Sequence, residues 1–305
     1  MTDDSLETLC DRQILRALRL NEAAPVSDIT RMSPQATREA YAVGRAPWNE
    51  GGPAMKASER GEYSTAEDAI AFVRHVPEDA TGVLVYLHGG GWVTGSTETH
   101  DGIMRRIAEA SHRTVVGLDY PLAPESRRER TLRLLSEVCD RIFEAESGRI
   151  AFGGDSAGAE LALSLALLRR DAGKRMPDRL ALLYPALWPD FDTDSYRLRG
   201  EGDFGLSEAR MRAYFGHYLG EGGEALDTEP DCRGLPDTLI LGAALDCLLD
   251  DAFEIARQLA DANVPLLMQV VPGAPHGFLH YSLASRLARR ANRDIGRFLR
   301  LAVGR

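Results

Sequence analysis

Cysteine is scarce in this chain, which has four cysteines among 305 residues: Cys10, Cys139, Cys232 and Cys247. No two of them form a C-x-x-C pair, and no cysteine and histidine cluster has the spacing of zinc ligands. A chain of this length can bury enough apolar surface to fold without disulfides or a structural metal. Cys139 and Cys247 lie in apolar runs, so we predict that both are buried thiols.

Long apolar runs are also lacking. No run reaches the ~18 residues that a membrane-spanning helix needs, so we expect no membrane partner. The first residues, Met1 to Asp4, are acidic and lack the basic and then apolar order of a secretory signal. We therefore expect a cytoplasmic protein.

Positive charge is in the minority. The chain has 36 Lys and Arg against 46 Asp and Glu, a net charge of -10 and a pI near 5.3. Phosphate binding needs clustered Lys and Arg, so this composition argues against a nucleic-acid partner. Arg127, Arg128 and Arg130 lie among glutamates, and we interpret this basic run as a solvated helix face.

A series of short apolar runs begins at about residue 83. Most of these runs are continuously apolar, which is typical of strands buried on both faces of a parallel sheet that helices cover. We therefore predict an α/β fold with a mostly parallel central sheet, to which Ile70–Val76 adds an antiparallel edge strand. The predicted parallel strands are Val83–Leu87, Thr114–Leu118, Ile150–Phe152, Leu180–Leu183, Thr238–Leu241 and Leu266–Val271.

Two segments interrupt this series and predict a cap over one end of the sheet. Residues 1–60 indicate N-terminal helices, followed by a loop rich in Gly and Pro over Pro47–Gly61. Residues 61–305 form the predicted core, into which about 186–230 inserts a second cap segment. This insertion is rich in aromatic residues. We expect most of them to form the core of the cap and one or two to line a pocket.

The segment Gly154-Asp-Ser-Ala-Gly158 has the spacing G-x-S-x-G, and it lies between a strand and a helix. In that context the motif forms a sharp turn that exposes the serine hydroxyl at the end of the sheet. The glycines are needed because side chains there would collide with neighbouring backbone. We predict that Ser156 is a nucleophile; a phosphate-binding turn is the alternative.

The segment His88-Gly-Gly-Gly-Trp92 directly follows the predicted strand Val83–Leu87. Consecutive glycines leave backbone N–H groups free to face a ligand, and such donors stabilise the oxyanion of acyl transfer. We predict that the N–H groups of Gly90, Gly91 and Ala157 form an oxyanion hole and that His88 orients the loop. The alternative is a flexible loop without a binding role.

A serine hydroxyl is a poor nucleophile and needs a base. His276 lies just after the strand Leu266–Val271, where an α/β sheet presents functional groups, and we predict that it is this base. Asp246 ends the run that begins at Thr238, so we predict that it orients the histidine. Asp250 and Asp251 follow and are expected to begin a helix. The histidines expected to be structural or on the surface are His75, His100, His112, His217 and His280.

Together these segments resemble the hormone-sensitive-lipase-like esterases over roughly residues 70–300. The chain order Ser156, Asp246, His276 is also the order of an α/β-hydrolase. The resemblance implies an α/β-hydrolase fold with a helical cap, no cofactor, and hydrolysis of short acyl esters. It rests on His88–Trp92, Gly154–Gly158, Asp246-x-Leu-x-Asp250, Pro275-His-Gly-Phe278 and Asp119-Tyr-Pro-Leu-Ala-Pro-Glu125.

The chain also departs from the family's pattern. None of the departures removes a triad residue, but they predict altered loop packing and an unusual substrate. The departures are Pro121 in place of Arg, Ala159-Glu160 in place of Gly-Asn, Ser126–Arg130 in place of a Pro-rich segment, and Ala244-Leu245 in place of Gly-Glu.

The sequence therefore predicts a serine carboxylesterase that acts on a small-molecule ester, without a metal or cofactor. We expect Trp92, Phe215 and Phe278 to contact the substrate. An amidase, formamidase or acyltransferase with the same triad stays open, as does a non-catalytic small-molecule receptor, although the retained His276 argues against a receptor. An edge strand near the C-terminus would allow a homodimer.

Overall fold

An eight-stranded sheet forms the centre of the molecule, in the order β1-β2-β4-β3-β5-β6-β7-β8. The computed structural model describes residues 6–20 and 26–300, so the acidic start at Met1 to Asp4 lies outside the described residues. Strands β3 to β8 are parallel, whereas β2 is antiparallel to both β1 and β4. The strands are β1 (Ala57–Ser64), β2 (Ala69–Val76), β3 (Val83–Leu87), β4 (Thr114–Asp119), β5 (Ile150–Asp155), β6 (Arg179–Leu183), β7 (Thr238–Leu245) and β8 (Leu266–Pro275).

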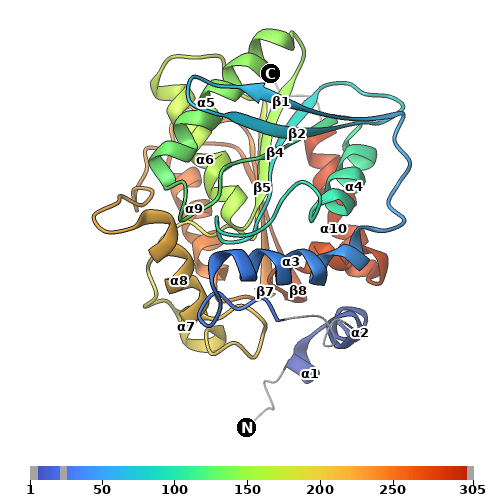
Figure 1. The fold of residues 1–305 in the computed structure, drawn as a ribbon, viewed down its shortest axis with the longest axis vertical. Coiled ribbons are helices and arrows are strands. Elements are labelled where there is room, and N and C mark those ends of the chain that lie inside the picture. The colour runs from blue at the N-terminus through green and yellow to red at the C-terminus, as the bar shows by residue number, and fades with distance from the viewer. Residues whose placement is uncertain (1–5, 21–25, 301–305) are drawn as a thin grey trace.

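Helices cover both faces of this sheet (Figure 1). Helices α4 (Asp101–Ser111) and α10 (Arg286–Arg300) lie on one face, and α5 (Arg128–Ala145), α6 (Ala157–Asp171) and α9 (Leu249–Asp261) lie on the other. Successive side chains of a strand point to opposite faces. Val83, Val85 and Leu87 of β3 accordingly join one apolar cluster, while Leu84 and Tyr86 join the other. This explains why the strand is apolar without interruption.

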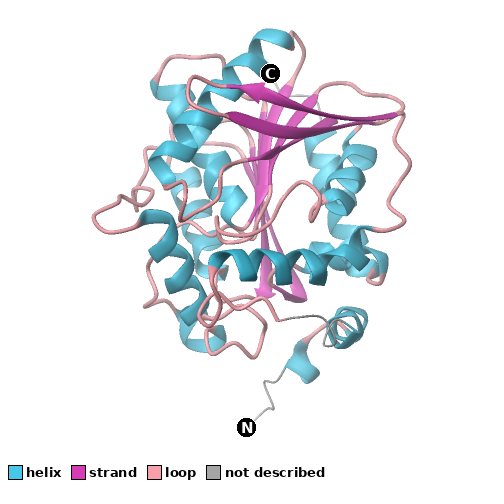
Figure 2. Ribbon diagram, viewed as in Figure 1, coloured by secondary structure: helices cyan, strands magenta, loops and turns pink. Residues whose placement is uncertain are grey.

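The remaining helices gather at the carboxyl ends of the parallel strands, as Figures 1 and 2 show. Two of them, α7 and α8, lie within the segment 186–230 that was expected to be inserted into the core. These cap helices are α1 (Leu6–Leu9), α2 (Arg12–Leu20), α3 (Pro34–Asn49), α7 (Asp194–Arg199) and α8 (Glu208–Leu219), and the 3-10 helix η1 (Phe278–Leu283) follows β8.

The structure confirms each predicted parallel strand but corrects the interpretation of the N-terminal region. Strand β1 lies where a loop was expected, and it pairs outside β2, so β2 is not the edge of the sheet. Strand β1 is mostly exposed and polar, which gave no apolar signal in the sequence. Helix α3 begins at the Ser33 cap and Pro34, and it continues through Pro47, which lies near its end.

Two further expectations concern the cysteines and the membrane. Cys139 and Cys247 are buried free thiols, as predicted, and Cys10 and Cys232 are buried as well. Across residues 6–20 and 26–300, no helix combines the length and the apolar character needed to cross a bilayer.

Candidate active site

Ser156 lies in a sharp turn between β5 and α6. Its backbone adopts φ 54° and ψ -121°, a conformation that non-glycine residues rarely take. Close packing around the turn explains the glycine two residues later, because a Cβ at Gly158 would collide with the carbonyl oxygen of Leu87. The turn therefore holds the Ser156 side chain where it lines a cavity at the carboxyl end of the sheet.

The structure brings Ser156, His276 and Asp246 together. The Ser156 Oγ lies 2.9 Å from Nε2 of His276, and Nδ1 of the same ring lies 2.6 Å from Oδ2 of Asp246. His276 follows β8 and Asp246 follows β7, so two adjacent parallel strands deliver them to the same edge. The backbone N–H of Leu248 donates to the other Asp246 oxygen at 3.0 Å. This geometry lets the ring accept the hydroxyl proton while Asp246 holds the opposite nitrogen.

Asp250 and Asp251 lie in the first turn of α9, as predicted. Asp250 accepts a hydrogen bond from the Ser195 N–H at 2.8 Å. Asp251 accepts one from the Leu187 N–H at 2.7 Å, and burial raises the pKa of its carboxyl to about 8. Both acids therefore tie the cap segment to α9 and do not contact His276.

Gly90 and Gly91 line the same cavity as Ser156, and Ala157 is the first residue of α6. Within the described part of the chain, the amides of these three residues donate no hydrogen bond to the protein. Gly91 has φ +61°, and a Cβ there would overlap the ring of Tyr214. Gly90 and Gly91 thus bring N–H groups without a described protein partner to the cavity that Ser156 also lines.

Asp155 is buried under the glycine loop. Its Oδ1 accepts hydrogen bonds from the Tyr86 hydroxyl at 2.7 Å and from the Gly89 N–H at 2.9 Å, and its Oδ2 lies 3.5 Å from Nε2 of His100. Burial acts to raise the pKa of Asp155, but the charge of His100 and these hydrogen bonds outweigh it and lower the pKa to about 2. Asp155 is therefore an anchor for the loop.

His88 and the Asp119–Glu125 block also support the loop. The His88 ring stacks on Tyr120 with centroids 4.3 Å apart, and the Tyr120 hydroxyl donates to the His88 carbonyl at 2.7 Å. Arg38 of α3 donates to the carbonyls of Val93 and Ala123, both at 2.8 Å. The cap helix is thereby fastened to the chain on both sides of the site.

Two buried histidines were not recognised in the sequence as part of this site. His100 and His280 have ring centroids 4.7 Å apart, and Nε2 of His280 lies 3.5 Å from the Tyr41 hydroxyl. Donor atoms of His100, Asp155 and His280 all lie within 4.8 Å of one another, a distance that a metal ion could bridge. Because Asp155 already accepts the hydrogen bonds that anchor the glycine loop, we assign the cluster a supporting role.

Glu160, which replaces the Asn of the family's pattern, is buried behind the glycine loop. Its Oε1 accepts from Arg128 at 2.9 Å and from Ser164 at 2.8 Å, and its Oε2 accepts from Trp92 Nε1 at 3.3 Å and from the Tyr218 hydroxyl at 3.0 Å. Glu160 therefore takes part in the packing of the glycine loop through the indole of Trp92. The expectation of a fully solvated basic run is wrong at Arg128, because that side chain turns inward to pair with Glu160.

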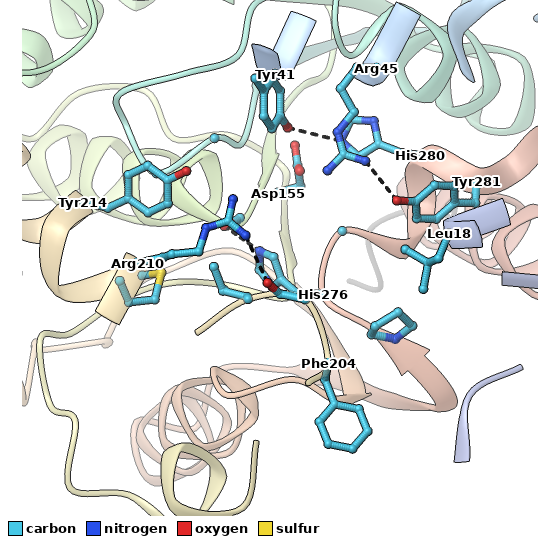
Figure 3. Close-up of a pocket in the computed structure, with 18 residues that line it drawn as sticks. Leu18, Tyr41, Arg45, Asp155, Phe204, Arg210, Tyr214, His276, His280 and Tyr281 are labelled. Atoms are coloured by element: carbon cyan, nitrogen blue, oxygen red, sulfur yellow. Dashed lines mark hydrogen bonds between the residues drawn. The ribbon is translucent and has the colours of Figure 1, made fainter. Parts of the chain in front are cut away.

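A cavity of about 220 Å³ opens between the triad and the cap. Figure 3 shows side chains from α3, α8 and η1 around it. The cap residues that line it include Leu18, Tyr41, Arg45, Phe204, Arg210, Met211 and Tyr214. Sequence reasoning did not single out these residues, because no spacing rule links an N-terminal helix to an insertion some 160 residues later.

Trp92, Phe215 and Phe278 do not line this cavity. The Trp92 ring stacks on Tyr218 with centroids 4.3 Å apart, and Phe215 packs 4.8 Å from Trp92. Phe278 is fully buried. Adjacent residues on a helix point in different directions, so Tyr214 faces the cavity while Phe215 faces the core. None of the three rings that were expected to contact the substrate lines this cavity, whereas the cap residues named above do.

A family model and several solved structures match this chain. A family model described as alpha/beta hydrolase fold matches residues 84–280. An ester-hydrolase from the metagenome of Lake Arreo is 26% identical, with 95% of this chain and 98% of that chain covered and a TM-score of 0.88. A hyperthermophilic esterase from the archaeon Pyrobaculum calidifontis is 25% identical, with 96% and 98% covered and a TM-score of 0.87. An esterase from the bacterial hormone-sensitive lipase family is 25% identical, with 96% and 99% covered and a TM-score of 0.83. These findings confirm the resemblance inferred from the motifs.

Proposed function

Because the chain belongs to the α/β-hydrolase fold family, we propose that it is a serine carboxylesterase that hydrolyses short-chain acyl esters. In this proposal Ser156 is the nucleophile, His276 is the general base and Asp246 is the carboxylate partner of the base. The observation that carries the proposal is the continuous hydrogen-bonded chain from the Ser156 hydroxyl through the His276 ring to Asp246. The esterases among the similar structures support an ester as the bond that is cleaved.

The reaction begins when the Ser156 oxygen attacks the ester carbonyl and its proton passes to Nε2 of His276. The imidazolium is stabilised by Asp246 and then protonates the leaving alkoxide, which departs as the alcohol and gives an acyl-enzyme. Water then attacks the acyl carbonyl while it loses a proton to His276, the bond between the Ser156 oxygen and the acyl group breaks, and His276 returns the proton to Ser156 as the acid leaves. Asp246 stays ionised throughout these steps.

Negative charge develops on the carbonyl oxygen in both transition states. The amides of Gly90, Gly91 and Ala157 are the groups that would stabilise it, and loss of one such donor costs about 3 kcal/mol in a serine protease with the same chemistry. Their positions in a tight loop and at the first turn of α6 support this role, because neither needs to reorganise as the charge forms.

The size of the cavity supports short acyl chains. A volume of about 220 Å³ accommodates a small ester, and the cap residues around it are held by contacts such as those of Arg38. A long acyl chain would need the cap to move. We therefore expect kcat/KM to fall steeply along a series of p-nitrophenyl esters from butanoyl to dodecanoyl.

Substitution of the nucleophile tests the proposal. Ser156→Ala should lower kcat on p-nitrophenyl butyrate by up to ~10⁶-fold, as in a well-studied triad series. A fluorophosphonate probe should label the wild type and leave the variant unlabelled. Unchanged turnover by folded Ser156→Ala protein would show that the mechanism is wrong.

A matched pair of substrates tests the choice of an ester over an amide. Both classes use the same catalytic groups, so the comparison must be made at equal acyl group and equal leaving-group size. We expect kcat/KM to be larger for the ester by more than the intrinsic difference in reactivity. A larger value for the amide would reassign the protein as an amidase.

A further inference from the structure

Two arginine side chains enter the cavity beside Ser156 from different cap elements. Arg45 comes from α3 and Arg210 from α8, and both line the cavity together with His276 (Figure 3). The chain as a whole has a net charge of -10, so this local positive charge does not follow from composition. The positive charge of Arg45 and Arg210 is therefore a property of the cavity and not of the chain as a whole.

The Arg45 guanidinium has only weak partners within the protein. It lies 5.0 Å above the Tyr41 ring, and its Nη1 donates to the Tyr281 hydroxyl at 3.4 Å. Across the described residues, no carboxylate is close enough to form an ion pair with it. A guanidinium has five N–H donors, and the bond to Tyr281 uses one of those on Arg45.

Arg210 is held by backbone carbonyls and not by an acid. It donates to the carbonyl of Gly205 at 3.0 Å and to that of Ser27, while its Nε is buried without a hydrogen-bond partner. The nearby Asp28 lies instead 3.4 Å from Arg31. Neutral carbonyls orient the guanidinium, and the charge of Arg210 helps to lower the pKa of Asp28 without forming an ion pair with it among the described residues.

Asp155 does not compensate either arginine. Among the described residues that line the cavity it is the one acid, and its oxygens already face Tyr86, Gly89 and His100. Arg45 and Arg210 are each partly buried, and a charge that has lost part of its hydration gains more from an anionic partner than a fully solvated charge does. We therefore expect the substrate to supply an anionic group that pairs with the two arginines.

We propose that the cavity binds short esters that carry a second, ionised carboxylate, and that Arg45 and Arg210 hold this carboxylate while the ester carbonyl lies against Gly90 and Gly91. This inference rests on the proposed function and narrows its substrate class. A guanidinium matches a carboxylate through two parallel hydrogen bonds, and such charge-assisted bonds are stronger than neutral ones. The carboxylate is a few bonds from the scissile ester, as in a monoester of a short dicarboxylic acid or an acyl ester of a hydroxy acid.

Matched pairs of substrates test this inference. Monoethyl glutarate and its neutral amide, ethyl glutaramate, place the charge on the acyl side, while acetoxyacetate and acetoxyacetamide place it on the alcohol side. Acid release is followed by pH-stat titration. For the substrate pair whose carboxylate lies on the side of the ester that faces the arginines, the wild type should favour the anion over the amide by at least ~10-fold in kcat/KM, because the anion accepts charge-assisted hydrogen bonds that the amide lacks.

Substitutions show whether the arginines cause the preference. Arg45→Gln and Arg210→Gln should each reduce the ratio of anion to amide by ~10-fold, mainly through KM, and 0.5 M NaCl should reduce it in the wild type. Arg212→Gln is the matched control, because it removes the same charge from an exposed position of α8 that does not line the cavity. Its ratio should stay within ~2-fold of the wild type.

The outcomes separate this inference from the proposed function. If the wild type hydrolyses p-nitrophenyl butyrate but shows no preference for either anion, the carboxylate site is wrong and the esterase stands. A preference that survives both arginine substitutions is also evidence against the site. If no ester is hydrolysed and the fluorophosphonate probe does not label Ser156, the proposed function and this inference fail together.

Discussion

Trp92 and Glu160 are joined by a hydrogen bond in which the indole Nε1 donates to Oε2 of Glu160 at 3.3 Å. Trp92 closes the glycine loop, and Glu160 lies on α6 one turn after Ser156. The bond therefore links the proposed oxyanion donors to the helix that positions the nucleophile. Arg128 balances the charge of Glu160 at 2.9 Å, so the link is a buried charged network.

Glu160→Gln should impair catalysis through the loop. It leaves Arg128 without its charged partner and weakens the acceptor that holds Trp92. A small displacement of aligned groups can cost up to ~10²-fold in rate, so we expect kcat on p-nitrophenyl butyrate to fall ~10- to 100-fold with a smaller change in KM. Ser164→Ala is the control, because Ser164 contacts Glu160 but not the loop. If kcat falls equally in both variants, the network stabilises the fold but does not position the glycine loop.

Asp246→Asn should lower kcat by ~10⁴-fold, the size of the loss when the equivalent carboxylate of a serine protease becomes an amide. The amide can present an N–H to His276, which favours the wrong tautomer of the ring. Asp250→Asn provides the matched control on the following helix, where the carboxylate contacts Ser195. Near-normal kcat in Asp246→Asn would remove Asp246 from the mechanism.

Gly91→Ala should reduce kcat strongly, because the added Cβ would overlap the Tyr214 ring and alanine resists φ +61°. Gly216→Ala, on the helix that carries Tyr214, is the contrasting change. A Cβ at Gly216 meets no other atom within 4 Å, so this variant should gain about 0.5–1 kcal/mol in unfolding free energy from helix propensity. Steady-state kinetics of both variants measure the change in kcat, and urea denaturation of both measures the change in unfolding free energy. If Gly91→Ala keeps full activity, the loop does not need its observed shape.

Asp251 should make the protein less stable as pH rises. Burial raises the pKa of its carboxyl to about 8, whereas an unfolded Asp titrates near ~3.9. Between these values the folded state keeps a proton that the unfolded state has lost, so the unfolding free energy falls with pH, by up to ~1.4 kcal/mol per pH unit for one proton. Asp251→Asn should remove this contribution and gain relative stability toward pH 8.

Urea denaturation at several pH values from ~4 to ~9 measures the effect, because the difference between wild type and variant isolates the Asp251 contribution. The Asn side chain keeps an oxygen that can accept from the Leu187 N–H. Parallel curves for the two proteins across this range would show that Asp251 is not protonated in the fold.

The sequence by itself determined the parallel sheet, because strands that are buried on both faces must be apolar at every position. It also determined which hydroxyl, imidazole and carboxylate would meet. Ser156, Asp246 and His276 each follow a strand, and the carboxyl ends of parallel strands share one edge. An apolar run and the residue that follows it are local features of the sequence, and the parallel order of the strands then brings those residues to one edge of the sheet.

Only the tertiary structure decided what surrounds those three groups. Strand β1 is polar and exposed, so it carried no apolar signal, and it forms because β2 offers it a pairing edge. Arg45 and Arg210 lie in cap segments whose approach is fixed by packing, and no local spacing encodes it. Trp92 and Phe215 looked like pocket residues, yet they pack into the core because side-chain direction on a loop or helix depends on how the element docks.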